Sequence, residues 1–189
     1  MIHLRGFPAT PKEDINWKNI WTHYQSFFIL SHDKEIIYKY MQFCLATNKK
    51  LWAMNLVNTS NCDKCTGDRE ETQLHMFYEC EYVKPLFIWI LKCLSNVCNF
   101  KPSSNIKFIF FDNSYINSYQ NIICNLFIYI YVITIWRTRK ENLRIGDLKN
   151  VFIWGLSNYK NLIKHMPSKK CKKLSDKITA LDIDKLIDL

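Results

Sequence analysis

The chain contains little glycine and little proline, with only four Gly and five Pro among its 189 residues. An all-β protein needs many tight turns, and turns rely on these two residue types, so their scarcity disfavours that class. Hydrophobic residues make up 48% of the chain and aromatic residues 15%, which is enough to fill a core and excludes a largely disordered protein. Because the apolar segments are long and seldom interrupted, we predict a mainly α fold.

A secretory leader is also missing, since the first eight residues have no apolar stretch after a basic start. We therefore expect an intracellular protein, in the nucleus, the cytoplasm or both. In such reducing compartments clustered cysteines are more often metal ligands than disulfides. The longest apolar run, residues 122–136, is shorter than the roughly 20 residues that span a bilayer. We expect it to be a core helix, the alternative being a membrane helix, and we expect no membrane partner.

Several catalytic patterns are absent from the sequence as well. It shows no Ser/His/Asp set, no glycine-rich loop that could hold phosphates and no carboxylate pair suited to acid–base chemistry. We therefore predict that the chain is not an enzyme.

One cluster of metal-ligating residues stands out, with the spacing C-x2-C-x9-H-x4-C over Cys62, Cys65, His75 and Cys80. Two residues between the first pair let the backbone fold back and present both thiolates to one ion. Three thiolates and one imidazole form a closed tetrahedral set that is typical of structural zinc. We predict one structural Zn²⁺ ion. Two alternatives are that the four residues are unconnected, or that Cys93 or Cys98 replaces one of the ligands.

The apolar periodicity predicts a small helical domain built around this zinc knuckle, with a helical C-terminal extension. Asp14, Ser31 or His32, and Thr47 begin three helices, of which the second carries Cys44 and the third runs through Val57. Thr72 caps a short helix, which must end near Cys80 because positions five apart lie about 140° around an ideal helix. Longer helices are expected at 85–98, 119–141 and 147–165. The predicted parts are a zinc-binding domain at 13–98 with the knuckle at 62–80, a linker with a possible short strand at 99–117, a C-terminal helical region at 118–166, and a basic tail with a short amphipathic helix at 167–189.

The formal net charge is +9, but it is unevenly distributed along the chain. Residues 61–100 carry more acidic than basic side chains, whereas the segments on either side are basic. If the chain binds a polyanion, most of the electrostatic attraction must therefore come from the segments that flank the knuckle.

The run from Asn61 to Cys80, with Val83 and Trp89 beyond it, resembles the zinc-binding (CCHC) domain of reverse transcriptases from non-LTR (LINE-type) retrotransposons. In that family a C-x-x-C pair is followed by an acidic stretch that ends in Glu-Thr, then by His-Leu-Phe-x-x-Cys and a Trp. Glu71-Thr72 and His75-Met-Phe77 match this pattern, with Met in place of the usual Leu. The flanks are similar to the segments that surround the knuckle in the family, including its C-terminal region.

The family's catalytic elements do not carry over to this chain. There is no Phe/Tyr-x-Asp-Asp element of a polymerase centre, and Lys101-Pro102 is followed by Ser103 where related nucleases carry an acidic residue. The resemblance thus implies a piece of such a polyprotein that binds RNA, DNA or both, without the polymerase centre. The candidate nucleic-acid-binding residues are Lys49, Lys50, Lys64, Arg69, Arg137, Arg139, Lys140, Arg144, Lys169, Lys170, Lys172 and Lys173.

The alternative is a structural or protein-interaction domain without direct nucleic-acid contact. In it the zinc ion joins short helices, and the apolar faces dock on a polymerase or another protein. The aromatic residues fit both hypotheses equally well.

Overall fold

The computed structural model describes Lys18 and residues 30–66, 68–98 and 118–164. Of these residues 66% are helical, and none lies in a named strand, which confirms the predicted mainly α fold. Four predictions lie outside the described residues: the helix that begins at Asp14, the possible short strand in the linker 99–117, the basic run at 169–173 and the last amphipathic helix. The predicted domain limits are not tested.

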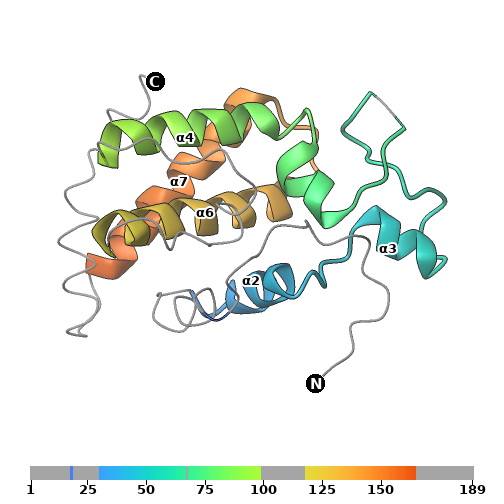
Figure 1. Ribbon diagram of the computed structural model, residues 1–189, viewed down its shortest axis with the longest axis horizontal. Coiled ribbons are helices and arrows are strands. Elements are labelled where there is room, and N and C mark those ends of the chain that lie inside the picture. The colour runs from blue at the N-terminus through green and yellow to red at the C-terminus, as the bar shows by residue number, and fades with distance from the viewer. Residues whose placement is uncertain (1–17, 19–29, 67, 99–117, 165–189) are drawn as a thin grey trace.

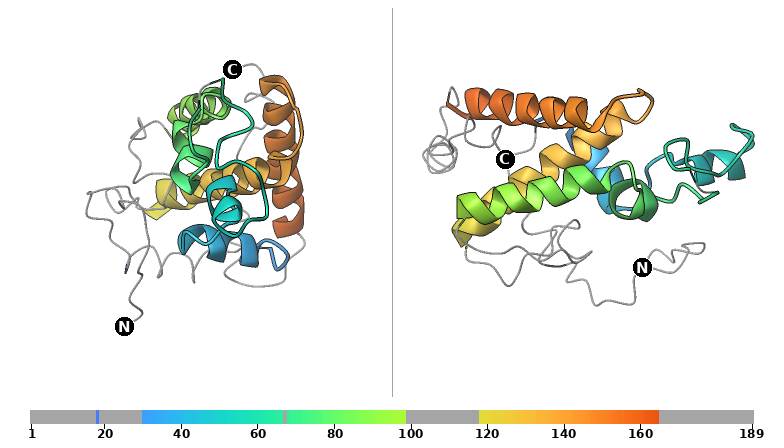
Figure 2. Two further views of the ribbon diagram at one scale, coloured as in Figure 1. Left: turned by 90° about the vertical axis from the view of Figure 1, so that its right-hand side faces the viewer. Right: turned by 90° about the horizontal axis from the view of Figure 1, so that it is seen from above.

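Six helices follow one another in the described part of the chain: α2 (Lys34–Met41), α3 (Asn48–Ala53), the π-helical turn η1 (His75–Glu79), α4 (Lys84–Cys98), α6 (Ser118–Thr138) and α7 (Ile145–Lys164). Helix α6 packs against α2, α4 and α7 (Figures 1 and 2). Helix α3 and the loop that follows it project from one end of this group (Figure 1). Proline is tolerated in a first helical turn, and Pro85 is the second residue of α4, as predicted.

Helix α6 is the centre of the core, which explains its almost uninterrupted apolar sequence. The stretch Gln120–Thr138 is long and apolar enough to cross a membrane, yet 83% of its apolar window is buried inside the protein. A helix that is apolar on all sides fits such a position, because protein surrounds it on every side. Close packing is visible at Gly155 of α7, where an added Cβ would lie only 3.0 Å from Cγ2 of Ile130.

Buried side chains from both sides of the predicted linker belong to one core. The rings of Tyr40 and Phe77 lie 4.9 Å apart, centroid to centroid, and those of Phe127 and Phe152 lie 5.5 Å apart. All four rings are almost completely buried in the same cluster. The knuckle segment and the C-terminal helices therefore stabilise one another by sharing apolar contacts.

Two predicted helices end earlier than their apolar pattern suggested. Helix α2 ends at Met41, which leaves Cys44 exposed beyond it, and α3 ends at Ala53 and not at Val57. In both cases a left-handed residue follows, Phe43 with φ 53° and Asn55 with φ 56°. Backbone bonds from the next residues then return to the last turn, as in a Schellman motif (Cys44 N to Lys39 O, 2.7 Å; Leu56 N to Leu51 O, 2.9 Å).

Candidate metal centre

The two cysteines of the C-x2-C pair come from a small hairpin. Asn61 and Glu70 form an isolated antiparallel bridge. The amide of Cys62 donates to the carbonyl of Arg69 (2.8 Å), and the amide of Glu71 donates to Ser60 (2.8 Å). These bonds fix Cys62 on one arm of the hairpin and leave Cys65 in the turn that follows, so that both sulfurs face the next helix.

The other two ligands come from the short helix that follows the hairpin. The hydroxyl of Thr72 accepts a bond from the amide of His75 (3.0 Å), so that Thr72 caps the helix as predicted. The turn from His75 to Glu79 is a π-helix, which the periodicity did not reveal. Its wide loop is closed by the amide of Cys80, which donates to the carbonyl of His75 (2.8 Å). This hydrogen bond between positions five apart brings Cys80 back over His75, and the helix ends there.

The four predicted ligands converge at this point. The Sγ atom of Cys65 lies 3.3 Å from Nε2 of His75 and 3.3 Å from Sγ of Cys80, and Sγ of Cys62 lies 3.8 Å from Sγ of Cys80. All four ligand atoms lie within 4.8 Å of one another, and three of the four residues are buried. Among the described residues Cys93 does not belong to this group, and the side chain of Cys98 is not described. The geometry is that of a site able to hold one metal ion.

The polar surroundings favour a thiolate at this site. A hydrogen bond from the Cys80 thiol lowers the pKa of Cys62 well below its usual range, because it stabilises the charged form. The same bond raises the pKa of Cys80, which keeps the shared proton. On the far side of the imidazole, Nδ1 of His75 lies 3.9 Å from a carboxylate oxygen of Glu79. This separation is too long for a hydrogen bond, so the carboxylate acts through its negative charge, which favours a proton on Nδ1 and leaves Nε2 for a metal.

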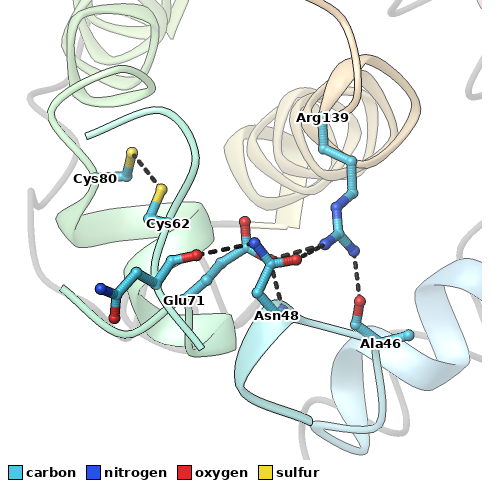
Figure 3. Close-up of polar contacts among 7 residues, drawn as sticks. Ala46, Asn48, Cys62, Glu71, Cys80 and Arg139 are labelled. Carbon is cyan, nitrogen blue, oxygen red and sulfur yellow. Dashed lines mark hydrogen bonds and ion pairs between the residues drawn. The ribbon is translucent and has the colours of Figure 1, made fainter. Parts of the chain in front are cut away.

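A buried ion pair attaches the knuckle to the end of α6 (Figure 3). Arg139 donates to Oε1 of Glu71 (2.8 Å) and to the carbonyl of Ala46 (2.5 Å), and both charged side chains are less than a tenth exposed. Asn48 joins the same network. Its backbone amide donates to the same Glu71 oxygen (2.8 Å), and its side chain donates to the carbonyl of Asn61 in the hairpin (2.9 Å). Three distant segments therefore meet beside the knuckle.

Several candidate nucleic-acid-binding residues make internal contacts. Arg137 pairs with the buried Asp33 (2.6 Å), Lys49 pairs with Glu70 (2.5 Å), and Lys50 donates to the carbonyl of Phe43. Arg139 belongs to the buried network just described, and Lys64 donates to Glu141 and Asn142 in the α6–α7 loop. Their role in nucleic-acid binding stays a prediction.

Of the other candidates, Arg69, Lys140 and Arg144 are exposed. The lysines at 169–173 lie outside the described residues.

No local pattern in the sequence indicates the Glu71–Arg139 pair, because the two residues are 68 positions apart in the chain. No protein-family model matches the chain, and no curated protein or solved structure is significantly similar to it.

Proposed function

We propose that the chain is a zinc-binding module that contacts nucleic acid and resembles the C-terminal part of a LINE-type reverse transcriptase without its polymerase centre. The observation that carries this proposal is the convergence of Cys62, Cys65, His75 and Cys80, whose ligand atoms all lie within 4.8 Å of one another. The resemblance of the knuckle sequence supplies the nucleic-acid part of the proposal.

Zinc is the metal that suits the site best. A tetrahedron with zinc–sulfur bonds of about 2.3 Å has edges of roughly 3.8 Å. Three of the distances between the ligand atoms of Cys62, Cys65, His75 and Cys80 are 3.3, 3.3 and 3.8 Å. One ion therefore fits among them with small adjustments. Three thiolates and one imidazole complete the coordination sphere and leave no position for a reacting water, as in structural zinc sites. An ion held in this way would stabilise the fold and would not itself take part in a reaction.

Two features of the surface support contact with a polyanion. The chain carries a net charge of +9, which favours association with nucleic acid at low salt. In addition, the contact between Lys64 and Asn142 (3.0 Å) brings the C-x2-C turn next to the α6–α7 loop. The exposed Lys140 and Arg144 lie on or beside that loop, so basic residues from two segments share one region of the surface.

The test is direct binding of the zinc-loaded chain to structured RNA, single-stranded DNA and duplex DNA across a salt series. We expect affinity to fall steeply with salt, because each phosphate contact releases counterions. If 100 mM added salt left the affinity unchanged, the nucleic-acid role would be wrong.

A second candidate function is a zinc-stabilised domain that binds protein, and one observation favours it. Trp52, Met54 and Leu56, at the end of α3, are each more than half exposed, and exposed apolar clusters mark interaction surfaces. Zinc-loaded, folded protein that does not bind any nucleic acid at low salt would support this function over the first.

A further inference from the structure

A groove between α4 and the first turns of α7 has a basic lining that the sequence did not single out. It has a volume of about 640 Å³, and its lining includes Lys84, Ile88 and Lys92 from α4 and Lys149 from α7. Glu81 is also part of the lining. None of the three lysines belongs to the candidate residues derived from the sequence.

The three lysines are arranged along and across the groove. Lys84, Ile88 and Lys92 follow one another at four-residue intervals, so Lys84 and Lys92 lie about 12 Å apart along the axis of α4. Lys149 belongs to the other wall, and its Nζ lies 5.0 Å from the centre of the Trp89 ring. That ring is only 5% exposed, so it supports the ammonium group through a cation–π contact and has no open face for a base. The groove therefore offers charge without a stacking surface.

We propose that this groove binds the sugar-phosphate backbone of a nucleic acid through Lys84, Lys92 and Lys149. This inference rests on the proposed function and names the surface that performs it. Each nucleotide of a strand carries one phosphate. Two lysines about 12 Å apart along a helix can therefore contact separate phosphates of the same strand. Binding here depends on charge and does not discriminate among base sequences.

The groove is attached to the metal centre through Cys80. The carbonyl of this ligand accepts the amides of Val83 (3.1 Å) and Lys84 (3.0 Å), and so begins helix α4. The first turn of α4, with Lys84 on it, thus takes its position from the knuckle. A metal that fixes Cys80 also fixes one end of the phosphate-binding surface.

The test compares two triple variants of the full zinc-loaded chain that lose the same charge. The groove variant is Lys84→Gln/Lys92→Gln/Lys149→Gln, and the control is Lys34→Gln/Lys39→Gln/Lys164→Gln, whose lysines are not part of the groove lining. With a fluorescent single-stranded oligonucleotide, the loss of three contacts weakens binding roughly 50-fold at 0.15 M salt and lowers the slope of log affinity against log salt by about 2. The control changes affinity far less, and equal zinc content and melting temperature show that both variants are folded.

The variant Glu81→Gln should change the affinity for nucleic acid in the opposite direction. Removing the carboxylate from the groove strengthens binding a fewfold, since a like charge no longer repels the phosphates. If the groove variant binds as the control does while the wild type shows steep salt dependence, the groove is the wrong surface and the proposed function stands. If the wild type itself does not bind, both are wrong. Equally tight binding of poly-glutamate of matched charge would overturn the assignment to nucleic acid.

Discussion

The buried pair between Glu71 and Arg139 allows the sharpest test of how the knuckle is attached to the helical core. Replacing Arg139 by Met removes the guanidinium and leaves Glu71 in a site where its side chain is 8% exposed. Breaking a buried ion pair by removing one partner costs about 3–5 kcal/mol. We expect the low end of that range, about 3 kcal/mol, because Glu71 keeps the bond from the amide of Asn48 (2.8 Å).

The double variant Arg139→Met/Glu71→Gln isolates the charge. Gln retains an oxygen that can accept the Asn48 amide but carries no charge to desolvate, so the double variant should be more stable than Arg139→Met alone. We expect a difference of about 1–2 kcal/mol. Lys49→Met is the control, since it breaks an ion pair with Glu70 that is partly exposed on both sides. Such a pair contributes at most about 1 kcal/mol.

The pH dependence of the stability of these variants provides a second, independent test of the ion pair. Burial raises the pKa of Glu71 above its ordinary value of 4.5, while Arg139 acts to lower it. Removing Arg139 therefore raises the pKa further. A raised native pKa means that the folded state takes up the proton more readily, so stability is lost as the pH rises through the native pKa. The deficit of Arg139→Met relative to the double variant should shrink as the pH is lowered toward that value.

The assay is urea unfolding at a fixed free zinc concentration, because a metal that binds the folded state shifts its apparent stability. The reasoning would be refuted if Arg139→Met and the double variant were equally stable at every pH, or if the Lys49→Met control lost as much as Arg139→Met.

Three further predictions concern the centre and the core. Cys65→Ser or His75→Ala should remove most of the folding stability, since metal binding and folding are coupled in structural sites; equal melting temperatures of the wild type with and without a strong chelator would argue against this. Thr72→Ala should cost about 1 kcal/mol in urea unfolding through loss of the cap on His75, and Thr72→Ser should recover most of it; no difference between the two would remove the capping role. Tyr129→Phe should cost about 1.5–3 kcal/mol, because the Tyr129 hydroxyl donates to the buried Asp33 carboxylate (2.6 Å); an unchanged urea midpoint would show that the bond is not needed.

The sequence predicted what local patterns encode. The C-x2-C spacing and Thr72 located the knuckle and its helix, apolar periodicity located α4 and α7, and the long apolar run located α6. Helix ends were less accessible, since hydrophobic residues continue past both α2 and α3. One local signal was present, because Asn55 is a residue that tolerates the left-handed conformation and so favours the end of a helix. Phe43 offers no such signal, as a bulky residue seldom adopts this conformation.

Two features of the site depend on contacts that no local pattern contains. The π-helical turn at His75 follows from the need to bring positions five apart to one point, and a regular helical repeat does not reveal it. The roles of Arg137 and Arg139 depend on partners far away in the chain, Asp33 and Glu71. Read as single residues they are basic side chains at a helix end, while in the fold they make ion pairs with carboxylates that are almost fully buried.

The central claim is that Cys62, Cys65, His75 and Cys80 hold one zinc ion. X-ray absorption at the zinc edge, combined with the metal content of the purified chain, tests it most directly. The account predicts one zinc per chain, with three sulfur neighbours at about 2.3 Å and one nitrogen at about 2.0–2.1 Å. Four sulfur neighbours, an oxygen in the coordination sphere or a chain that folds without bound metal would contradict it.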